Sequence, residues 1–212
     1  MRRFLPFFPL SIVVFPGEVV KLHVFEPRYR QLINEVVKEE RTFGIPVVLD
    51  KKAADIATEV QVVSIDRRYE KGDLDIRVRG LRKVMVHRYF HKMPDRLYPG
   101  GEVEGIADIL DSDELLQEKV FALLSKIHEI LGIQQPLMVD AVDIAAYKVG
   151  HNVGFSLAQE YELLKLPTEL ARLKMIHSHL EMLLPMVIRT EQLKARARLN
   201  GHYKNLIPPD VM

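Results

Sequence analysis

Histidine pairs are the residues whose type and spacing come closest to a metal site. His87 and His91 are four positions apart, and His177 and His179 are two apart. Histidines four apart on one helix can share a zinc ion, whereas residues two apart on a helix do not face each other. Because the surrounding residues place His87 in a strand and His91 in a loop, we predict no metal site.

Catalytic nucleophiles are the second chemistry to consider. The chain contains no cysteine, which excludes a thiolate nucleophile, a disulfide scaffold and a Cys-ligated zinc site. Its serines lie in no recognisable nucleophile motif, and Ser156, followed by Gln159, is better explained as a helix cap. The sequence has no G-x-x-x-x-G-K-[ST] loop to hold ATP phosphates. We therefore predict no catalytic residue, no enzyme activity and no cofactor, and we keep a cryptic hydrolase as an alternative.

Aromatic residues near the N-terminus are the candidate binding residues. The run at positions 4–16 is unusually apolar for a chain end. Exposed aromatic side chains give sequence-tolerant contact with apolar segments of another polypeptide, and an open strand edge adds backbone pairing with an extended peptide. We expect Phe7, Phe8 or Phe15 to be partly exposed, and we predict peptide contacts at Phe7, Phe8, Phe15 and Tyr29.

The C-terminal stretch carries a local excess of positive charge. The basic residues of this stretch outnumber its two acidic residues, Glu191 and Asp210. They are Arg189, Lys194, Arg196, Arg198 and Lys204. We favour a solvated helix face, with RNA binding as the alternative. The whole chain has a formal net charge of only +1, so no global field attracts nucleic acid or membrane. No apolar stretch reaches the roughly 18 residues of a transmembrane helix, and we expect a cytoplasmic protein without a membrane partner.

Periodicity predicts that short strands and one helix position the N-terminal residues. Pro27 suits the first position of a helix, Gly72 allows a hairpin turn, and Gly80 ends the strand that follows this turn. Alternating or β-branched residues predict strands at 19–25, 43–49, near Val60, at 73–79, 83–89 and 102–109, and apolar residues on one face predict a helix at 27–40.

From Asp111 onward the apolar period changes from 2 to 3.6 residues. Asp111 and Glu114 resemble a capping box that opens a helix ended by Gly132. A short helix at 140–149, another opened by Ser156 and a long last helix follow, and Pro185 should kink or stop the last one. With 48% hydrophobic and 28% charged residues, the chain can bury a core large enough to fold without disulfide bonds or a structural metal. We predict a β-rich subdomain at 1–110 and a helical bundle subdomain at 111–212.

Several motifs cover nearly the whole chain. They are Phe7-Phe8-Pro9-Leu10, Val13-Val14-Phe15-Pro16-Gly17, Leu22-His23-Val24-Phe25-Glu26-Pro27-Arg28-Tyr29-Arg30, Phe43-Gly44-Ile45, and the segment from Leu163 to Leu173. Together they resemble the N-terminal, substrate-binding domain of Lon proteases. The stretch 55–59 departs from the family pattern, as does the loop before Glu102. We interpret Pro16, Gly17, Phe25, Glu26, Pro27 and Arg28 as structural residues of this motif, with Glu26 or Arg28 pinning the helix to the barrel.

The resemblance implies an α+β fold, in which a small PUA-like β-barrel with one helix precedes an α-helical bundle. In full Lon proteases this domain captures substrate proteins and helps the hexamer to assemble, and ATPase and protease modules follow it. Because this sequence ends at Met212, we expect a stand-alone, non-catalytic binding module or proteolysis adaptor. The partners that the resemblance implies are unfolded or hydrophobic protein segments, a separate ATP-dependent protease and a weak homo-oligomer.

Overall fold

The computed structural model describes residues 1–111, 113–134 and 145–203, with the side chains of the last five of these left out. Strands dominate its first half and helices its second. The strands are β1 (Arg3–Pro6), β2 (Val19–Val24), β3 (Phe43–Leu49), β4 (Lys52–Arg68), β5 (Leu74–Phe90) and β6 (Gly100–Ile106). The helices are α1 (Pro27–Lys38), α2 (Glu114–Leu131), α3 (Ala145–Val149), α4 (Leu157–Lys165) and α5 (Glu169–Tyr203).

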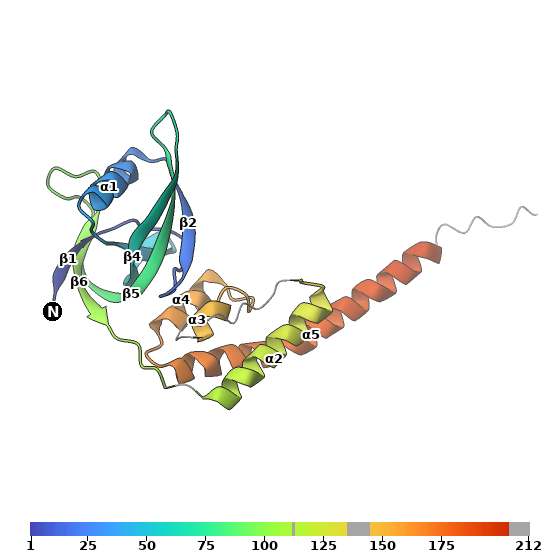
Figure 1. The fold of residues 1–212 in the computed structure, drawn as a ribbon. Coiled ribbons are helices and arrows are strands. Elements are labelled where there is room, and N and C mark those ends of the chain that lie inside the picture. The colour runs from blue at the N-terminus through green and yellow to red at the C-terminus, as the bar shows by residue number, and fades with distance from the viewer. Residues whose placement is uncertain (112, 135–144, 204–212) are drawn as a thin grey trace, which may run out of the picture.

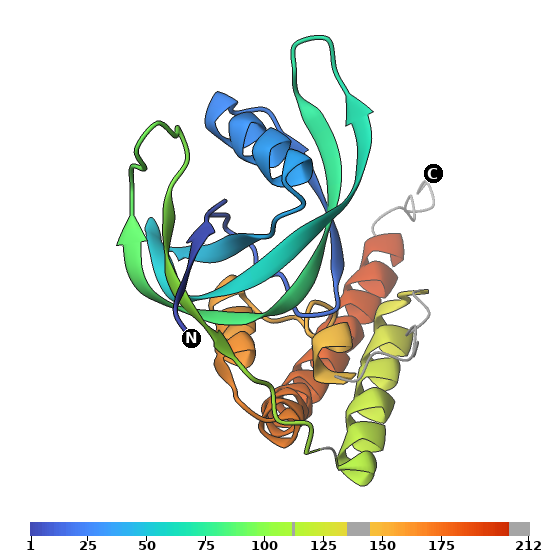
Figure 2. The same ribbon diagram turned by 60° about the vertical axis from the view of Figure 1, so that its left-hand side comes forward.

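All strands pair antiparallel in one sheet with the order β1-β6-β5-β4-β3, and β2 pairs with the first part of β5. Just after β1, parallel bridges from Phe7 to Gly44 and from Leu10 to Val47 connect the N-terminal segment to β3. The sheet therefore curls on itself. Figures 1 and 2 show α1 in the open side of this curved sheet and the other helices gathered on the opposite side.

The helix α1 forms because its apolar residues recur with helical spacing and face the concave side of the sheet. Tyr29, Leu32, Ile33 and Val36 are buried there, as the sequence predicts, whereas Val37 remains 38% exposed. They pack on inward-facing residues of the sheet, which include Phe43, Ile45, Val60, Leu74, Ile76 and Val78. This cluster fixes α1 relative to the strands.

A second core cluster joins the two halves of the chain. Phe15, from the loop after β1, is fully buried and stacks on Tyr147 of α3 at 5.0 Å between ring centroids. His151 also contacts the Phe15 ring, and it bonds Glu160 of α4 at 2.8 Å and Glu18 at 3.2 Å. Burial alone would lower the pKa of His151, but these two carboxylates raise it to about 9.

A buried ionic network reinforces the same junction. Arg172 of α5 bonds Glu169 at 3.0 Å and Asp108 at 2.7 Å, and Asp108 also pairs with Lys83 of β5 at 2.8 Å. The side chains of Arg172 and Lys83 are fully buried. Burial lowers the pKa of Lys83, although Asp108 opposes this effect. Buried charges persist only when they are paired, so this network ties the sheet to α5.

Two glycines bear on predictions made from the sequence: the turn predicted at Gly72 is confirmed, and the strand end predicted at Gly80 is wrong. Gly72 adopts a positive φ of 88° in the turn between β4 and β5, as the sequence predicts. Gly80, however, does not end a strand, because β5 continues through it to Phe90. A Cβ on Gly80 would lie 2.2 Å from the carbonyl oxygen of Phe15. The glycine therefore permits the loop after β1 to cross the sheet at close range.

One other expectation at a helix end needs correction. Asp113, not Asp111, caps α2 and accepts a hydrogen bond from the backbone N–H of Leu116 at 3.0 Å. Asp111 instead accepts from the N–H of Leu170 at the start of α5. The long last helix is present and continues through Pro185 to Tyr203, so of the two effects expected of Pro185 the stop does not occur, and the kink stays a prediction. The predicted Ser156–Gln159 capping box and the left-handed Gly132 are both confirmed.

The described strands and helices confirm an α+β chain with an antiparallel sheet followed by helices. Of the short helix predicted at 140–149, the part at 140–144 lies outside the described residues. No helix among the described residues is long and apolar enough to cross a membrane.

Candidate functional site

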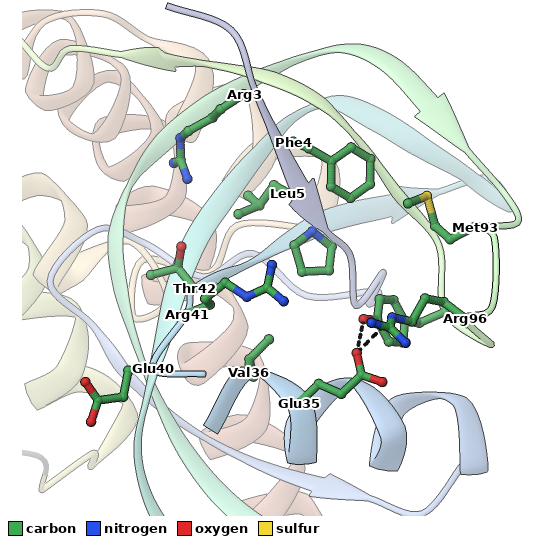
Figure 3. A pocket seen from close by; sticks show the side chains of 12 residues that line it. Arg3, Phe4, Leu5, Glu35, Val36, Glu40, Arg41, Thr42, Met93 and Arg96 are labelled. Atoms are coloured by element: carbon green, nitrogen blue, oxygen red, sulfur yellow. Dashed lines mark hydrogen bonds and ion pairs between the residues drawn. The ribbon is translucent and has the colours of Figure 1, made fainter. Parts of the chain in front are cut away.

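A hollow of about 450 Å³ lies beside β1, at the seam of the curved sheet. The strand β1 pairs with β6, but its bridges to β3 begin only after Pro6. The space between β1 and the residues just before β3, at 40–42, is therefore open. Figure 3 shows the side chains around it, which come from β1, from the C-terminal end of α1 and from the loop before β6. They are Arg3, Phe4, Leu5, Pro6, Glu35, Val36, Glu40, Arg41, Thr42, Met93, Arg96 and Tyr98.

A buried carboxylate anchors one side of this hollow. Glu59 of β4 is almost fully buried and accepts hydrogen bonds from Arg3, from Thr42 Oγ1 at 2.5 Å and from Arg82 Nε at 2.6 Å. Burial alone would raise the pKa of Glu59, but the bonds from Thr42, Arg82 and Arg3 outweigh it and lower the pKa below its usual value. The ionised Glu59 thereby fixes β1 to β4 at Arg3.

The opposite rim is tied to α1 by Glu35. Its carboxylate accepts from the Tyr98 hydroxyl at 2.5 Å and pairs with Arg96 Nε at 3.0 Å, as the dashed lines in Figure 3 show. Burial, and then the hydrogen bond to Glu35, raise the pKa of Tyr98 to about 12. Gln31 also accepts a bond from the backbone N–H of Leu97. The loop at 91–99 is therefore positioned by α1.

A second hollow of about 430 Å³ continues the first around the end of α1. Both hollows are lined by Val36, Glu40 and Arg41, and the second adds Val37 and Val63, which are 38% and 53% exposed. We call the two hollows together the α1 groove. Its remaining lining residues are Gln61, Val62, Ser64 and Ile65. The groove combines exposed apolar surface with charges of both signs and runs beside a strand edge.

Phe4 is the exposed aromatic residue of the groove, and it was not among the binding residues predicted from the sequence. It is 44% exposed, packs near Phe90 at 6.3 Å between centroids and leaves part of its ring in the hollow. Alternation along β1 is the signal that could have revealed it, because the neighbouring Leu5 points into the core.

The expectation of an exposed aromatic patch at Phe7, Phe8 or Phe15 is wrong. All three rings are buried: Phe8 and Phe15 pack between the sheet and helices, and Phe7 packs among residues of the strands. Tyr29 is buried with Phe8. Phe8 stacks on Tyr29 at 4.1 Å, and Phe7 packs against Tyr89 at 5.4 Å. Peptide contact at these four positions stays a prediction, but their side chains offer very little surface.

The structural motif residues behave partly as expected. Gly17 adopts a φ of 87° in the turn that begins at Pro16, and Pro27 is the first residue of α1. Glu26 and Arg28 pair with each other at 2.7 Å, so they do not pin α1 to the sheet. That link is made by Arg30, which bonds the backbone of Lys71 and the carboxylate of Asp73. The side chain of Phe25 is 60% exposed.

The remaining candidate residues do not converge. His87 pairs with Glu104 at 3.0 Å, whereas His91 lies beyond the end of β5, and His177 pairs with Glu181. In the described ranges no three His, Cys, Asp or Glu side chains group as a metal site requires. The basic residues Arg189, Lys194, Arg196 and Arg198 are exposed along the end of α5, and Lys204 lies outside the described residues.

Comparisons with known proteins agree with this fold. Residues 4–182 match the family described as the ATP-dependent protease La (LON) substrate-binding domain. The crystal structure of a Lon N-terminal domain protein from Xanthomonas campestris is 27% identical, with a TM-score of 0.61, and the match covers 86% of this chain and 98% of that one. The N-terminal domain of a Mycobacterium avium complex Lon protease is 15% identical, with a TM-score of 0.63, and covers 84% and 98%. The comparison with curated proteins gave no match. Since the family match spans most of the chain, this protein belongs to the Lon substrate-binding domain family.

Proposed function

We propose that this protein is a non-catalytic module that binds exposed apolar segments of other polypeptides in the α1 groove. Family membership supports substrate recognition in general, and the groove supplies the particular surface. The observation that carries the proposal is the open seam beside β1. There, an exposed aromatic ring lies beside a strand edge, and the groove continues around the end of α1 to two exposed valines.

An extended peptide fits this surface for two physical reasons. First, the outer edge of β1 offers backbone pairing, which is tolerant of sequence. Second, Phe4, Val37 and Val63 offer apolar contacts whose burial contributes roughly 25 cal/mol per Å². The mixed charges of Arg41, Glu40 and their neighbours at the rim favour no single charge pattern in the ligand. The groove should therefore prefer unfolded apolar segments over folded proteins.

We also propose that bound segments are passed to a separate ATP-dependent protease, so that the protein acts as a proteolysis adaptor. The family description, an ATP-dependent protease domain that binds substrate, supports this link. Closure of the sheet into a small PUA-like barrel, and the division at residues 110 and 111, likewise stay proposals. The bridges at Phe7 and Leu10 support the closure.

The test compares two exposed aromatic residues. Phe4→Ala removes the ring from the groove, whereas Phe25→Ala removes a ring of comparable exposure that lies outside its lining. Binding of fluorescent, chemically unfolded polypeptide is measured by polarisation. We expect Phe4→Ala to weaken binding by about tenfold, because an aromatic contact in an interface contributes roughly 1–2 kcal/mol, and Phe25→Ala to change it less than about twofold.

Equal affinity of the Phe4→Ala variant and the parent protein would contradict the assignment of the groove. Failure of the parent protein to bind any unfolded polypeptide would contradict the proposed function itself. Thermal unfolding of both variants separates a loss of binding from a loss of fold.

A further inference from the structure

A third hollow, at the opposite end of α1, is lined by cations and tyrosines. Its volume is about 510 Å³, within the roughly 300–1,000 Å³ range of small-molecule sites. Its lining residues are Pro9, Arg28, Tyr29, Val48, Lys51, Lys52, Ala53, Tyr89, His91 and Pro99. Three of them carry permanent positive charge, and none is acidic. In a chain of net charge +1, such a concentration of one sign is a local feature.

The lysines of this hollow are positioned by a tight hairpin. Leu49 pairs with Lys52, so Asp50 and Lys51 form a two-residue turn between β3 and β4. Both turn residues have positive φ, 47° and 65°, which is the type I′ arrangement. Neither Lys51 nor Lys52 has an ion-pair partner among the described residues, whereas Arg28 is paired with Glu26. Two uncompensated ammonium groups therefore border the hollow.

The rings of the two tyrosines in the lining already pack against other side chains of the protein. What each tyrosine can offer to a ligand in the hollow is therefore its hydroxyl group. Tyr29 stacks on Phe8 and carries the Arg28 guanidinium 4.6 Å from its ring centroid. Tyr89 packs against Phe7 and His91. Neither hydroxyl has a hydrogen-bond partner in the described part of the chain. Neither is among the fully buried polar atoms without a partner, so both remain accessible from the hollow.

Both phenols keep their protons at neutral pH, so each hydroxyl is able to donate a hydrogen bond to an acceptor in the hollow. Burial, and then the neighbouring Tyr29, raise the pKa of Tyr89 to about 12. Burial likewise raises the pKa of Tyr29, although Arg28 opposes it. Arg28 and Tyr29 also lie in the first turn of α1, where the helix dipole favours a negative charge.

We propose that this hollow is a binding site for a small molecule that carries a phosphate group, as a monoester or a diphosphate. A phosphate monoester has nearly two negative charges and three acceptor oxygens at neutral pH, which matches several cations and two hydroxyl donors. A single carboxylate, with one charge and two oxygens, leaves part of these donors unused. Pro9, Val48, Ala53 and Pro99 line the rest of the hollow and can contact the group attached to the phosphate.

The site is separate from the α1 groove. Arg28 lines the phosphate site and Glu35 lines the groove, and seven residues of helix place them about 10 Å apart along the axis. Occupancy of one site therefore does not exclude occupancy of the other. The phosphate site does not depend on the proposed peptide function.

The test is titration of the isotope-labelled protein with inorganic pyrophosphate, glycerol 3-phosphate and acetate, followed by NMR. We expect saturable shifts of the backbone amides at 50–53 and 89–91 with both phosphates, and much weaker binding of acetate. The relative affinity of the first two ligands distinguishes a diphosphate from a monoester site. Acetate binding as tight as that of either phosphate would overturn the proposal.

Matched variants test the lining residues. Lys51→Ser with Lys52→Ser should weaken phosphate binding by about tenfold or more, because a hydrogen bond to a charged group can contribute a factor of ten. Lys119→Ser with Lys126→Ser removes the same charge from exposed positions of α2 and should leave the affinity within about twofold. Tyr29→Phe with Tyr89→Phe removes only the two hydroxyls and should weaken binding by about fivefold. An absence of saturable binding, equal losses in both lysine pairs, or full affinity of the tyrosine pair would overturn the proposal.

Discussion

Replacing Arg172 by Met should strongly destabilise the protein, because it leaves a buried negative charge without its cation. Arg172 donates to Glu169 at 3.0 Å, to Asp108 at 2.7 Å, to the Tyr147 hydroxyl at 3.1 Å and to the backbone oxygen of Leu166 at 2.8 Å. The side chain of Glu169 is 2% exposed. Without Arg172, its one remaining hydrogen-bond donor among the described residues would be the backbone N–H of Ala146, the second residue of α3. Breaking such a buried pair costs about 3–5 kcal/mol.

The assay is urea unfolding followed by far-ultraviolet circular dichroism, since the chain contains no tryptophan. Adding Glu169→Gln to Arg172→Met should recover part of the loss, because the amide has no charge and its oxygen still accepts the N–H of Ala146. The matched control is Lys165→Met, which breaks an exposed pair with Glu162 and should cost less than about 1 kcal/mol. A cost below about 1 kcal/mol for Arg172→Met, or a further loss in the double variant, would refute this reasoning.

Two further predictions concern the junction between the sheet and the helices. The pKa of His151, raised from 6.5 to about 9, implies stability that is fully present below pH 6.5 and is lost as the pH rises through about 9. Urea unfolding between pH 6 and 10 should show this loss in the parent protein and a flatter profile in His151→Gln; parallel profiles would contradict it. Gly80→Ala places a Cβ against the carbonyl oxygen of Phe15 and should cost about 1–3 kcal/mol, whereas Gly105→Ala, which meets nothing within 4 Å, should cost less than about 1 kcal/mol. Equal thermal midpoints of these two variants would show that the close approach of Phe15 does not require a glycine at position 80.

Local periodicity predicted most of the elements because it reports which face of each element is buried. The strand at 43–49 and the start of α1 at Pro27 have the predicted bounds. The buried alternation of Leu74, Ile76 and Val78 is also as predicted. These features depend on residues close in sequence, and pattern rules describe such residues well.

Contacts between distant segments were not predictable in the same way. Gly80 resembles a strand end in isolation, but its role is to accommodate the Phe15 carbonyl oxygen from another part of the chain. Asp111 resembles a helix cap, yet it serves α5 rather than α2. In each case the decisive partner is more than 50 residues away, and a single sequence does not record which distant residues meet.

The candidate site was missed for a related reason. The aromatic residues at 4–16 do include an exposed ring, but it is Phe4, and the structure uses Phe7, Phe8 and Phe15 to fill the core. An apolar run identifies surface to be buried without saying which members stay outside. The cations of the phosphate site come from α1 and the β3–β4 turn, and only the curl of the sheet brings them together.

The most direct measurement of the central claim is site-specific photocrosslinking to an unfolded polypeptide. A photoreactive residue replaces Val63, which is 53% exposed in the α1 groove, or Leu115, which is 62% exposed on α2. We predict that crosslinks form from position 63, that an unlabelled apolar peptide competes with them, and that position 115 gives few. Equal crosslinking from both positions, or none from position 63, would contradict the claim that the α1 groove binds polypeptide.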